Sequence, residues 1–393
     1  MKPSVDCPIC KSSHVSLFEH RSDVPVMMHR LYDTAADAIA CKRATLTMQR
    51  CLDCGFSWNS AFDPAIVDYD DLYENAQTHS AIFIKHVEDC AQLIIGSVPA
   101  GSPIDYLEIG CGQGDFLELC ARLSGDRLRT AVGFDPSFRG ADGERRGPAT
   151  IHKVYFTAST AERLKHAPNI VVSRHTIEHI PNPASFLTAI RNALGPASEA
   201  RLFIETPCID WIIKNRAMHD LFYEHCSIFN AESLAFAMED AGFTGVQVEH
   251  VFGGQYLLAN GNAGPPKKKA SMPASTAADH ISPDAAFHYA EHWHREMAAA
   301  AERGPVAIWG AGAKGVTFAF LLDPNGARIQ HVIDINPAKQ GKYLAGSGIQ
   351  IVSPEVAAGI SPATIFVMNP NYIEEIRKTA LAAGISARLI PIN

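Results

Sequence analysis

The stretch "IDYLEIGCGQGDFLELC", Ile104 to Cys120, decides the fold of this chain. Apolar residues from Ile104 to Ile109 predict a buried strand, and a helix is expected to begin at about Asp115. Between them glycines alternate with other residues, which permits a tight turn and leaves bare backbone for a ligand. The turn opens a helix N-terminus, which favours a carboxylate or a phosphate group. A strand, a glycine-rich turn and a helix in this order predict an α/β fold that binds a nucleotide-like cofactor.

Two later strands carry polar residues to the same edge of the predicted sheet. The segment "AVGFDPS" predicts a strand ending at Asp135, where an acid can hold two ribose hydroxyls. The segment "NIVVSRHTIEHIPNP" predicts a short strand from Ile170 to Ser173. His175 follows closely, so we expect it at the carboxyl end of that strand, where open α/β sheets bind ligands. Glu178 and His179 either order this loop or take part in chemistry, and the segment alone leaves both open.

The stretch "LEIGCGQGDFL", Leu107 to Leu117, resembles the first motif of the class I S-adenosylmethionine-dependent methyltransferases. The matching residues are an acid before the turn, three alternating glycines and the acid after the second strand: Glu108, Gly110, Gly112, Gly114 and Asp135. The resemblance implies that Glu108 and the turn hold the amino-acid end of S-adenosylmethionine, and that Asp135 holds its ribose. The segment from His175 through His179 is also similar to one that borders the cofactor in this family.

A stretch upstream, "YDDLYENAQTHSAIFIKHVEDC", predicts an acidic turn that enters an amphipathic helix. Tyr73, Gln77 and Ser80 are spaced by four and three residues and would share one face of that helix. In related methyltransferases such a helix closes over the methionine end of the cofactor. Gln77 is therefore expected either to contact the cofactor or to pack within the helix, and the sequence leaves both open.

The N-terminal region contains two CxxC pairs: Cys7, Cys10, Cys51 and Cys54. A CxxC turn points two thiolates at one point, and two such turns form a tetrahedral four-sulfur zinc site. Gly55 fits a tight knuckle in which the backbone approaches the sulfurs. A closed four-thiolate site leaves no open position for chemistry, so we predict a structural zinc ion. A redox-active CxxC and four unrelated buried thiols are the alternatives.

Composition narrows the class of protein. The chain has 393 residues and a net charge of −8, which favours two or three domains and argues against a general nucleic-acid binder. Its only basic run, Lys267–Lys269, lies in a loop rich in Pro, Gly and Ser. No stretch approaches an apolar membrane span, and no signal peptide is visible at the N-terminus. The sequence therefore predicts a cytoplasmic protein without nucleic-acid or membrane partners.

The segment "LFYEHCSIF", Leu221 to Phe229, places three proton-handling side chains between apolar residues: Tyr223, Glu224 and His225. It follows a predicted strand that ends at Glu205 and Thr206, so it is expected over the same sheet edge as the cofactor. Asn230 then begins a helix as its N-cap. From the segment alone, the three residues either stiffen a loop as satisfied polar groups or belong to an active site.

With its zinc module and its C-terminal domain, the chain is similar to the nucleotide-sugar C-methyltransferases, which methylate a ring carbon of a deoxysugar. The resemblance covers nearly the whole chain, and the Glu-His pair of that family stands in a "YHEHLSYFS" type segment. It implies that His225 is the base that removes a proton beside a ketone and leaves an enolate. Glu224 would orient His225 or support its charged form, and Tyr223 would hydrogen-bond the developing oxyanion.

The match to that family is incomplete. Phe222 stands where the family has Tyr, Tyr223 where it has His, and Asn75 where it has the second Tyr of a Tyr-x-Tyr helix. O- or N-methylation of another small molecule therefore stays open. A non-catalytic zinc-containing binding protein with vestigial cofactor folds is the third alternative, against which the intact Glu108 and Asp135 argue.

The C-terminal part carries a second glycine-rich turn with the spacing of the dinucleotide fingerprint: Gly310, Gly312 and Gly315. A second strand then ends at Asp334. Taken alone, this pattern predicts NAD binding. The family resemblance implies instead that this Rossmann-like domain helps to hold the substrate, whose diphosphate Lys314 and Lys339 could meet. Solvated surface lysines are the alternative.

The sequence thus predicts an α/β protein: a class I methyltransferase doubly wound sheet with an N-terminal zinc module and a C-terminal Rossmann-like domain. The predicted parts are a zinc module (1–70), a methyltransferase domain (71–260), a linker (261–283) and a substrate domain (284–393). We expect S-adenosylmethionine as cofactor, a structural Zn²⁺, a small-molecule acceptor from sugar biosynthesis, and a monomer or homodimer. The active site should lie where the domains meet.

Overall fold

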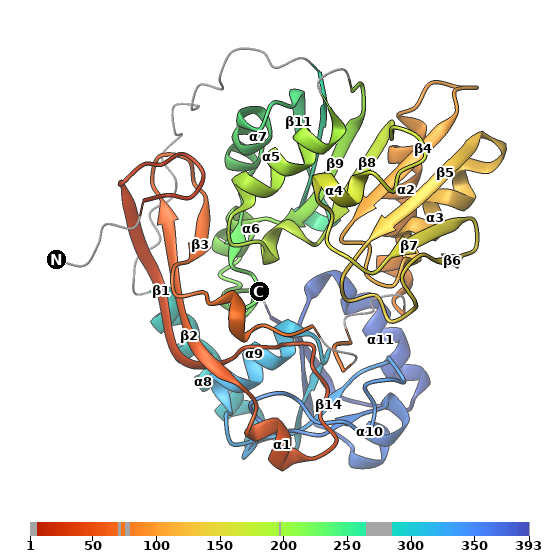
Figure 1. Cartoon of the computed structure of the whole chain (residues 1–393). Helices are drawn as coiled ribbons and strands as arrows, with labels where there is room; N and C mark the ends of the chain where they lie inside the picture. The colour runs from red at the N-terminus through yellow and green to blue at the C-terminus, as the bar shows by residue number, and fades with distance from the viewer. Residues whose placement is uncertain (1–5, 70–71, 75–78, 196–197, 265–284, 393) are drawn as a thin grey trace.

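The computed structural model describes residues 6–69, 72–74, 79–195, 198–264 and 285–392. Their strands form three sheets, of four, eight and five strands. In Figure 1 the N-terminal hairpin runs along one side of the molecule, the eight-stranded sheet with its helices fills the upper part, and the C-terminal domain lies below. Among these residues no helix combines the length and the apolar character needed to cross a membrane.

The eight-stranded sheet has a doubly wound arrangement. Its strands, in spatial order, are β11 (Thr244–Val251), β12 (Tyr256–Asn262), β9 (Arg201–Pro207), β8 (Ile170–Arg174), β4 (Ile104–Ile109), β5 (Leu128–Phe134), β7 (Ala149–His152) and β6 (Glu144–Arg146). The five strands from β9 to β7 are parallel, whereas β12, β11 and β6 run antiparallel to their neighbours. The carboxyl ends of β4, β5, β8 and β9 therefore meet at one edge, as predicted.

Helices cover both faces of this sheet. They are α2 (Ala81–Gly96) and α3 (Asp115–Ser124) on one face, and α5 (Pro183–Leu194) and α7 (Ala231–Asp240) on the other, with the short α4 (Ala158–Ala161) and α6 (Ile209–Lys214) in connections. Alternation along β4 sorts the side chains, because Tyr106 packs with α2 and α3 whereas Leu107 packs with α5 and α7. Asn230 caps α7 by accepting a hydrogen bond from Ser233 N–H, which confirms the predicted helix start.

The N-terminal sheet consists of a long hairpin and two short strands. They are β1 (Val15–Pro25), β2 (Arg43–Cys51), β3 (Ser57–Asn59) and β10 (Ser227–Ile228), and α1 (Ala35–Ile39) lies in the connection between β1 and β2. Strand β10 belongs to the segment "LFYEHCSIF" and pairs with β3 through Ser227 opposite Trp58. The segment that carries His225 thus leads directly into a strand of the N-terminal sheet.

The C-terminal domain is a five-stranded parallel sheet with helices on both faces. Its strands, in spatial order, are β15 (Ile351–Val352), β14 (Ile329–Ile333), β13 (Val306–Trp309), β16 (Thr364–Val367) and β17 (Arg388–Pro391). Its helices are α8 (Ala285–Ala301), α9 (Ala313–Leu322), α10 (Pro354–Ile360) and α11 (Ile373–Ala382). Trp293 and Phe318 pack α8 and α9 on one face, and Ala357 and Ile376 pack α10 and α11 on the other.

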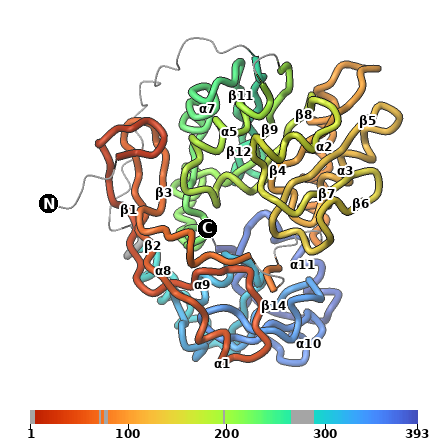
Figure 2. The backbone as a smooth tube through the Cα atoms, viewed as in Figure 1, coloured from red at the N-terminus to blue at the C-terminus, as the bar shows by residue number. Residues whose placement is uncertain are grey.

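The N-terminal hairpin joins the two α/β domains. Figure 2 shows it passing beside the eight-stranded sheet and reaching α1 at the C-terminal domain. There Gly346 N–H donates to Ala38 O at 2.9 Å, and Tyr343 N–H donates to Tyr32 O at 2.9 Å. One apolar core contains side chains of the hairpin, of the segment around 209–228 and of α9. The stretch between the two CxxC pairs is therefore a clamp across both domains.

Candidate active site

The turn between β4 and α3 is shaped by its glycines. Gly110, Gly112 and Gly114 have φ angles of 75°, 55° and 89°, which other residues rarely adopt. A Cβ at Gly110 would lie 2.2 Å from Thr176 Oγ1, whereas one at Gly112 would have no neighbour within 4 Å. The first glycine thus permits close packing against the loop after β8, and the second leaves the outer side of the turn open for a ligand.

The two predicted cofactor acids lie at this turn. Asp135 accepts hydrogen bonds from Gly112 N–H at 2.7 Å and from the Ser137 hydroxyl at 2.6 Å, so its carboxylate is tied to the turn. Glu108 is buried and accepts a hydrogen bond of 3.2 Å from the Tyr106 hydroxyl. Burial raises the pKa of Glu108 to about 8. A ligand ammonium group beside Glu108 would favour its charged form. The turn and both acids are therefore brought together.

The loop after β8 faces the same edge. His175, at the end of the strand, has a φ of 47°, and its Nδ1 lies 3.4 Å from Glu178 Oε1. The His175 ring lies 4.7 Å from the Tyr256 ring, centroid to centroid. Glu178 is buried and accepts a hydrogen bond of 3.1 Å from the Thr206 hydroxyl. Glu178 therefore orders the loop, while His175 and Glu178 both line the cavity described below.

His225 lies among aromatic rings. Its ring centroid lies 4.0 Å from that of Phe222 and 4.9 Å from that of His179. Among the residues that the structure describes, its buried Nδ1 has no hydrogen-bond partner. Burial, and then repulsion from a charged His179, lower the pKa of His225 well below its ordinary value. The imidazole is therefore neutral near neutral pH and has an unpartnered nitrogen, as a general base requires.

Glu224 and Tyr223 are bound to the N-terminal part. Glu224 is fully buried and accepts a hydrogen bond of 2.6 Å from Met28 N–H. The Tyr223 hydroxyl accepts one of 2.8 Å from Asp63 N–H, and its ring packs 5.3 Å from that of Phe62. In the described chain, neither side chain lines the cavity. This placement does not support the predicted contact of Tyr223 with a substrate oxyanion.

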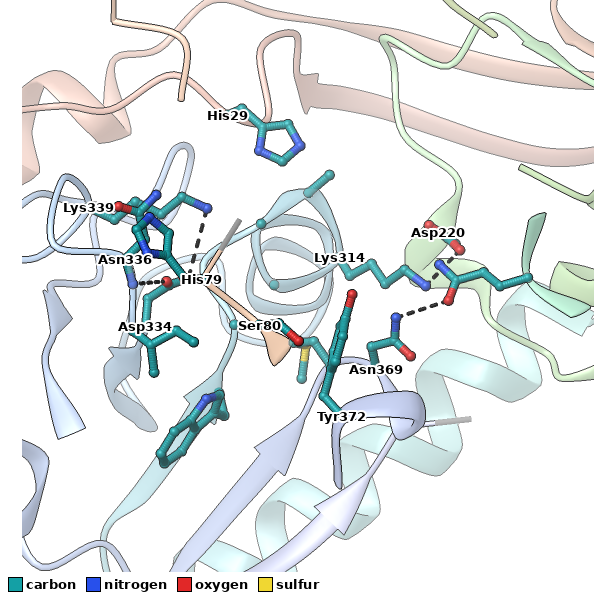
Figure 3. Close-up of a pocket in the computed structure, with 18 of the residues that line it drawn as sticks. His29, His79, Ser80, Asp220, Lys314, Asp334, Asn336, Lys339, Asn369 and Tyr372 are labelled. Atoms are coloured by element: carbon teal, nitrogen blue, oxygen red, sulfur yellow. Dashed lines mark hydrogen bonds and ion pairs between the residues drawn. The ribbon is translucent and has the colours of Figure 1, made fainter. Parts of the chain in front are cut away.

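A cavity of about 280 Å³ lies where the three parts meet. Its walls include His29 and Tyr73, the histidines His175, His179 and His225 with Glu178 and Tyr256, and Gly310, Gly312, Lys314, Asp334 and Lys339 of the C-terminal turn. Figure 3 shows Lys314 of α9 facing Asp220, at 2.9 Å between Nζ and Oδ2. The Asn369 amide donates to Gln255 Oε1 at 2.9 Å from the other domain. The cavity thus lies between the domains, where the sequence predicts the active site.

The second glycine turn opens into this cavity. Asp334 accepts a hydrogen bond of 2.8 Å from Ala311 N–H, as an acid at the end of a second Rossmann strand can. A Cβ at Gly315 would lie 2.0 Å from Gly310 O, so only a glycine at this position in the first turn of α9 allows the helix to lie so close to the turn after β13. Lys339 is buried, and its Nζ lies 3.8 Å from Asp334 Oδ2. The alternative that Lys314 and Lys339 are solvated surface lysines is therefore wrong.

The helix expected upstream of β4 begins later than predicted. Helix α2 starts at Ala81, and Ser80 is its N-cap because its hydroxyl accepts from Phe83 N–H. Tyr73 lies before the helix and forms an isolated bridge with Arg30. The prediction that Tyr73 and Ser80 share one helical face is therefore wrong. Gln77 lies outside the described residues.

Two family models match this arrangement. A methyltransferase domain matches residues 84–248, and a C-methyltransferase C-terminal domain matches residues 288–387. The first match contains the glycine turn with Glu108 and Asp135. The second contains the glycine turn of the C-terminal domain, which lines the cavity. The chain is an S-adenosylmethionine-dependent methyltransferase. The alternative of a non-catalytic binding protein is therefore set aside.

Individual relatives were found for this methyltransferase. It is 29% identical over 336 residues to the C-methyltransferase NovU of Streptomyces niveus, covering 77% of this chain and 75% of NovU. Among solved structures, the CurJ carbon methyltransferase is similar at 14% identity and a TM-score of 0.34, covering 47% of this chain and 56% of that one. An O-methyltransferase family protein from Burkholderia thailandensis is similar at 16% identity and a TM-score of 0.37, covering 47% and 57%. The two domain matches and NovU support a C-methyltransferase.

The four cysteines of the methyltransferase's N-terminal part come together. Their sulfurs lie within 4.8 Å of one another, with 3.6 Å between Cys7 and Cys54 and 3.4 Å between Cys10 and Cys51. A tetrahedron with zinc–sulfur bonds of about 2.3 Å has edges of about 3.8 Å, so the cluster fits a zinc ion. A Cβ at Gly55 would lie 2.4 Å from the Asn230 side chain. The knuckle therefore packs directly on the cap of α7.

Several site residues were not found by sequence reasoning. Arg174 ends β8, and its Nε donates to Glu205 Oε2 at 2.5 Å, while His86 Nε2 lies 2.5 Å from Glu205 Oε1. The alternation along the strand could have marked Arg174, because it lies two residues after the buried Val172 and therefore projects from the same face of the sheet. No motif marks His29, which lies in the clamp and reaches the cavity through the packing of the three parts.

Proposed function

We propose that this methyltransferase methylates a carbon beside the ketone of a nucleotide-linked keto-deoxysugar or a related small metabolite, with His225 as the base. The observation that carries the proposal is the neutral imidazole of His225 in the cavity between the domains, whose Nδ1 has no hydrogen-bond partner among the residues that the structure describes. One wall of that cavity is the loop beside the cofactor turn, and the other is the C-terminal glycine turn. A base between a methyl donor and a bound acceptor is what C-methylation needs.

The cofactor is assigned to the turn after β4. Glu108 and the turn would hold its amino-acid end, Asp135 its ribose, and His175 would border it. Bound S-adenosylmethionine supplies a methyl group on a positively charged sulfur, which a carbon nucleophile can attack. Contact by Gln77 stays a prediction of the sequence.

The chain's own residues make the acceptor carbon nucleophilic. His225 takes a proton from the carbon beside the ketone, and the electron pair of the broken C–H bond moves onto the carbonyl oxygen. Tyr73 lines the cavity beside Glu224 and favours the ionised form of that carboxylate. A hydrogen bond from Tyr223 to the resulting oxyanion stays a prediction of the sequence. Glu224 positions the segment through Met28.

The acceptor's nucleotide is assigned to the C-terminal turn. Lys314 lies in the first turn of α9 at the cavity, and the N-terminus of that helix attracts anions. Lys339 adds a second positive charge from a buried position. We also assign a structural zinc ion to Cys7, Cys10, Cys51 and Cys54. A cytoplasmic location and a monomeric or dimeric state stay predictions of the sequence.

The test uses S-adenosylmethionine labelled with carbon-13 at the methyl group. The purified protein is incubated with it and with a panel of nucleotide-linked 4-keto-deoxysugars, and products are analysed by two-dimensional NMR. A labelled methyl on a ring carbon is expected and names the position. A methyl on oxygen or nitrogen would instead establish O- or N-methylation, for which a neutral histidine is equally suited. No labelled product from any sugar would overturn the assignment of a sugar acceptor.

A further inference from the structure

Arg174 is a buried cation whose hydrogen bonds are incomplete. Its side chain is 9% exposed, and the guanidinium carbon lies 4.0 Å from the centre of the Phe116 ring. Its Nε is taken by Glu205, but its buried Nη2 has no hydrogen-bond partner in the described part of the chain. Leaving a charged donor unpaired inside a protein is costly, so such groups commonly mark a place where a ligand supplies the acceptor.

Arg174 lies beside the turn after β4, to which the cofactor is assigned. Arg174 pairs with Glu205 across β8 and β9, and Val172 pairs with Glu108 across β8 and β4. Side chains at Arg174, Glu205 and Glu108 therefore project from the same face of the sheet at its carboxyl edge. Phe116, on which the guanidinium stacks, belongs to the first turn of α3, directly after the glycines. The positive end of that helix adds to the attraction for an anion.

Glu205 holds the guanidinium in place. It is fully buried and accepts from Arg174 Nε, while its other oxygen lies 2.5 Å from His86 Nε2 of α2. Arg174 lowers the pKa of Glu205 far below its usual range despite burial, so the pair is charged. A fixed, stacked guanidinium with one free edge is preorganised to bind a second carboxylate.

We propose that Arg174 binds the carboxylate of the methionine part of S-adenosylmethionine, with Glu205 and His86 as positioning residues. The proposal rests on the assignment of the cofactor to the turn after β4. The amino-acid end of the cofactor is a zwitterion, and the negative charge of Glu108 can pair with its ammonium group but not with its carboxylate. Arg174 supplies the opposite charge on the adjacent strand.

The experiment compares two ligands that differ by this carboxylate. Isothermal titration measures the Kd of S-adenosylmethionine and of decarboxylated S-adenosylmethionine for the wild-type enzyme and for Arg174→Met. The wild type is expected to bind the intact cofactor about 10- to 100-fold more tightly, as a charge-assisted pair implies. Arg174→Met should lose this preference by weakening the intact cofactor alone, and Arg174→Lys should keep part of it. Equal affinities of the wild type for both ligands would overturn the proposal.

Matched variants separate this outcome from failure of the cofactor assignment. Arg122→Met, at an exposed arginine of α3, should leave both affinities unchanged. Asp135→Ala should weaken both ligands alike, because both contain the ribose. If Asp135→Ala changes neither affinity, the turn does not hold the cofactor, and both proposals fail. If Arg174→Met weakens both ligands equally, Arg174 is structural; the wild-type comparison tests the proposal even if that variant does not fold.

Discussion

The backbone N–H of Met28 donates a hydrogen bond of 2.6 Å to Oε2 of Glu224, 196 residues further along the chain. Arg21 strengthens the same link, because its guanidinium donates to Leu221 O at 2.8 Å and to Met218 O at 2.7 Å. The N-terminal clamp therefore positions the segment that carries His225. This explains why three proton-handling residues stand in an apolar stretch: Glu224 binds the clamp, Tyr223 binds Asp63 after the second CxxC pair, and His225 faces the cavity.

Glu224→Ala should lower the free energy of unfolding by about 1–3 kcal/mol, because it leaves the buried Met28 N–H without an acceptor. Glu224→Gln keeps an oxygen acceptor, so it should cost less. Urea denaturation followed by circular dichroism measures both, with Glu239→Gln at an exposed site of α7 as the matched control. Equal losses for the two Glu224 variants would show that the negative charge, and not the hydrogen bond, is what the fold requires.

The same position predicts a pH dependence of stability. Burial raises the pKa of Glu224 to about 7, above the value near 4.5 in the unfolded chain. A raised pKa contributes stability that is complete below the unfolded value and is lost as the pH rises through about 7. Glu224→Gln stays neutral, so its stability relative to the wild type should improve between pH 6 and pH 8. A difference that does not change over this interval would contradict the raised pKa.

His225→Asn should reduce methyl transfer by about 10²- to 10⁴-fold, the range that a general base contributes. It should leave the affinity for S-adenosylmethionine unchanged, because the turn after β4 is intact. The wild type should also exchange the acceptor's acidic carbon-bound proton with deuterated water, and the variant should not. His250→Asn, at an exposed histidine of β11, is the matched control. Methyl transfer at a near wild-type rate in His225→Asn would remove His225 as the base.

The sequence predicted the architecture well because each signal was local. The glycines after β4, the acid at Asp135 and the two CxxC pairs each lie within one short segment, and their roles in the fold follow from backbone geometry. The cavity wall was predicted less well. Tyr223 was assigned to the substrate because it neighbours His225, but its partner, Asp63, lies 160 residues away. Such contacts depend on how the three parts pack, which spacing along the chain does not encode.

The pH dependence of methyl transfer should reveal the environment of His225. Burial lowers the pKa of this imidazole, and the unprotonated form is the active base. Activity is lost as the pH falls through this lowered pKa, so kcat/KM should persist below pH of about 6.5, the ordinary value for histidine. The measurement is a profile of kcat/KM at pH values where the melting temperature is unchanged. An acid limb at or above pH 6.5 that is absent from His225→Asn would contradict the lowered pKa.

Loss of zinc should abolish methyl transfer while sparing cofactor binding. The cluster of Cys7, Cys10, Cys51 and Cys54 fixes the knuckles at the ends of the N-terminal sheet, and β10 of that sheet carries the segment after His225. The cofactor turn belongs to the eight-stranded sheet. Cys51→Ser should therefore lower the melting temperature and remove activity, yet still bind S-adenosylmethionine.

Elemental analysis by mass spectrometry should find one zinc per chain in the wild type and a loss in Cys51→Ser. Cys41→Ser is the matched control, because Cys41 is a half-buried thiol of the same part outside the cluster. It should keep both zinc and activity, since its sulfur has no place in the tetrahedron. A closed four-thiolate site contributes folding energy only when the metal is bound. A metal-free wild type that methylates at the full rate would therefore contradict the assignment of a structural zinc ion.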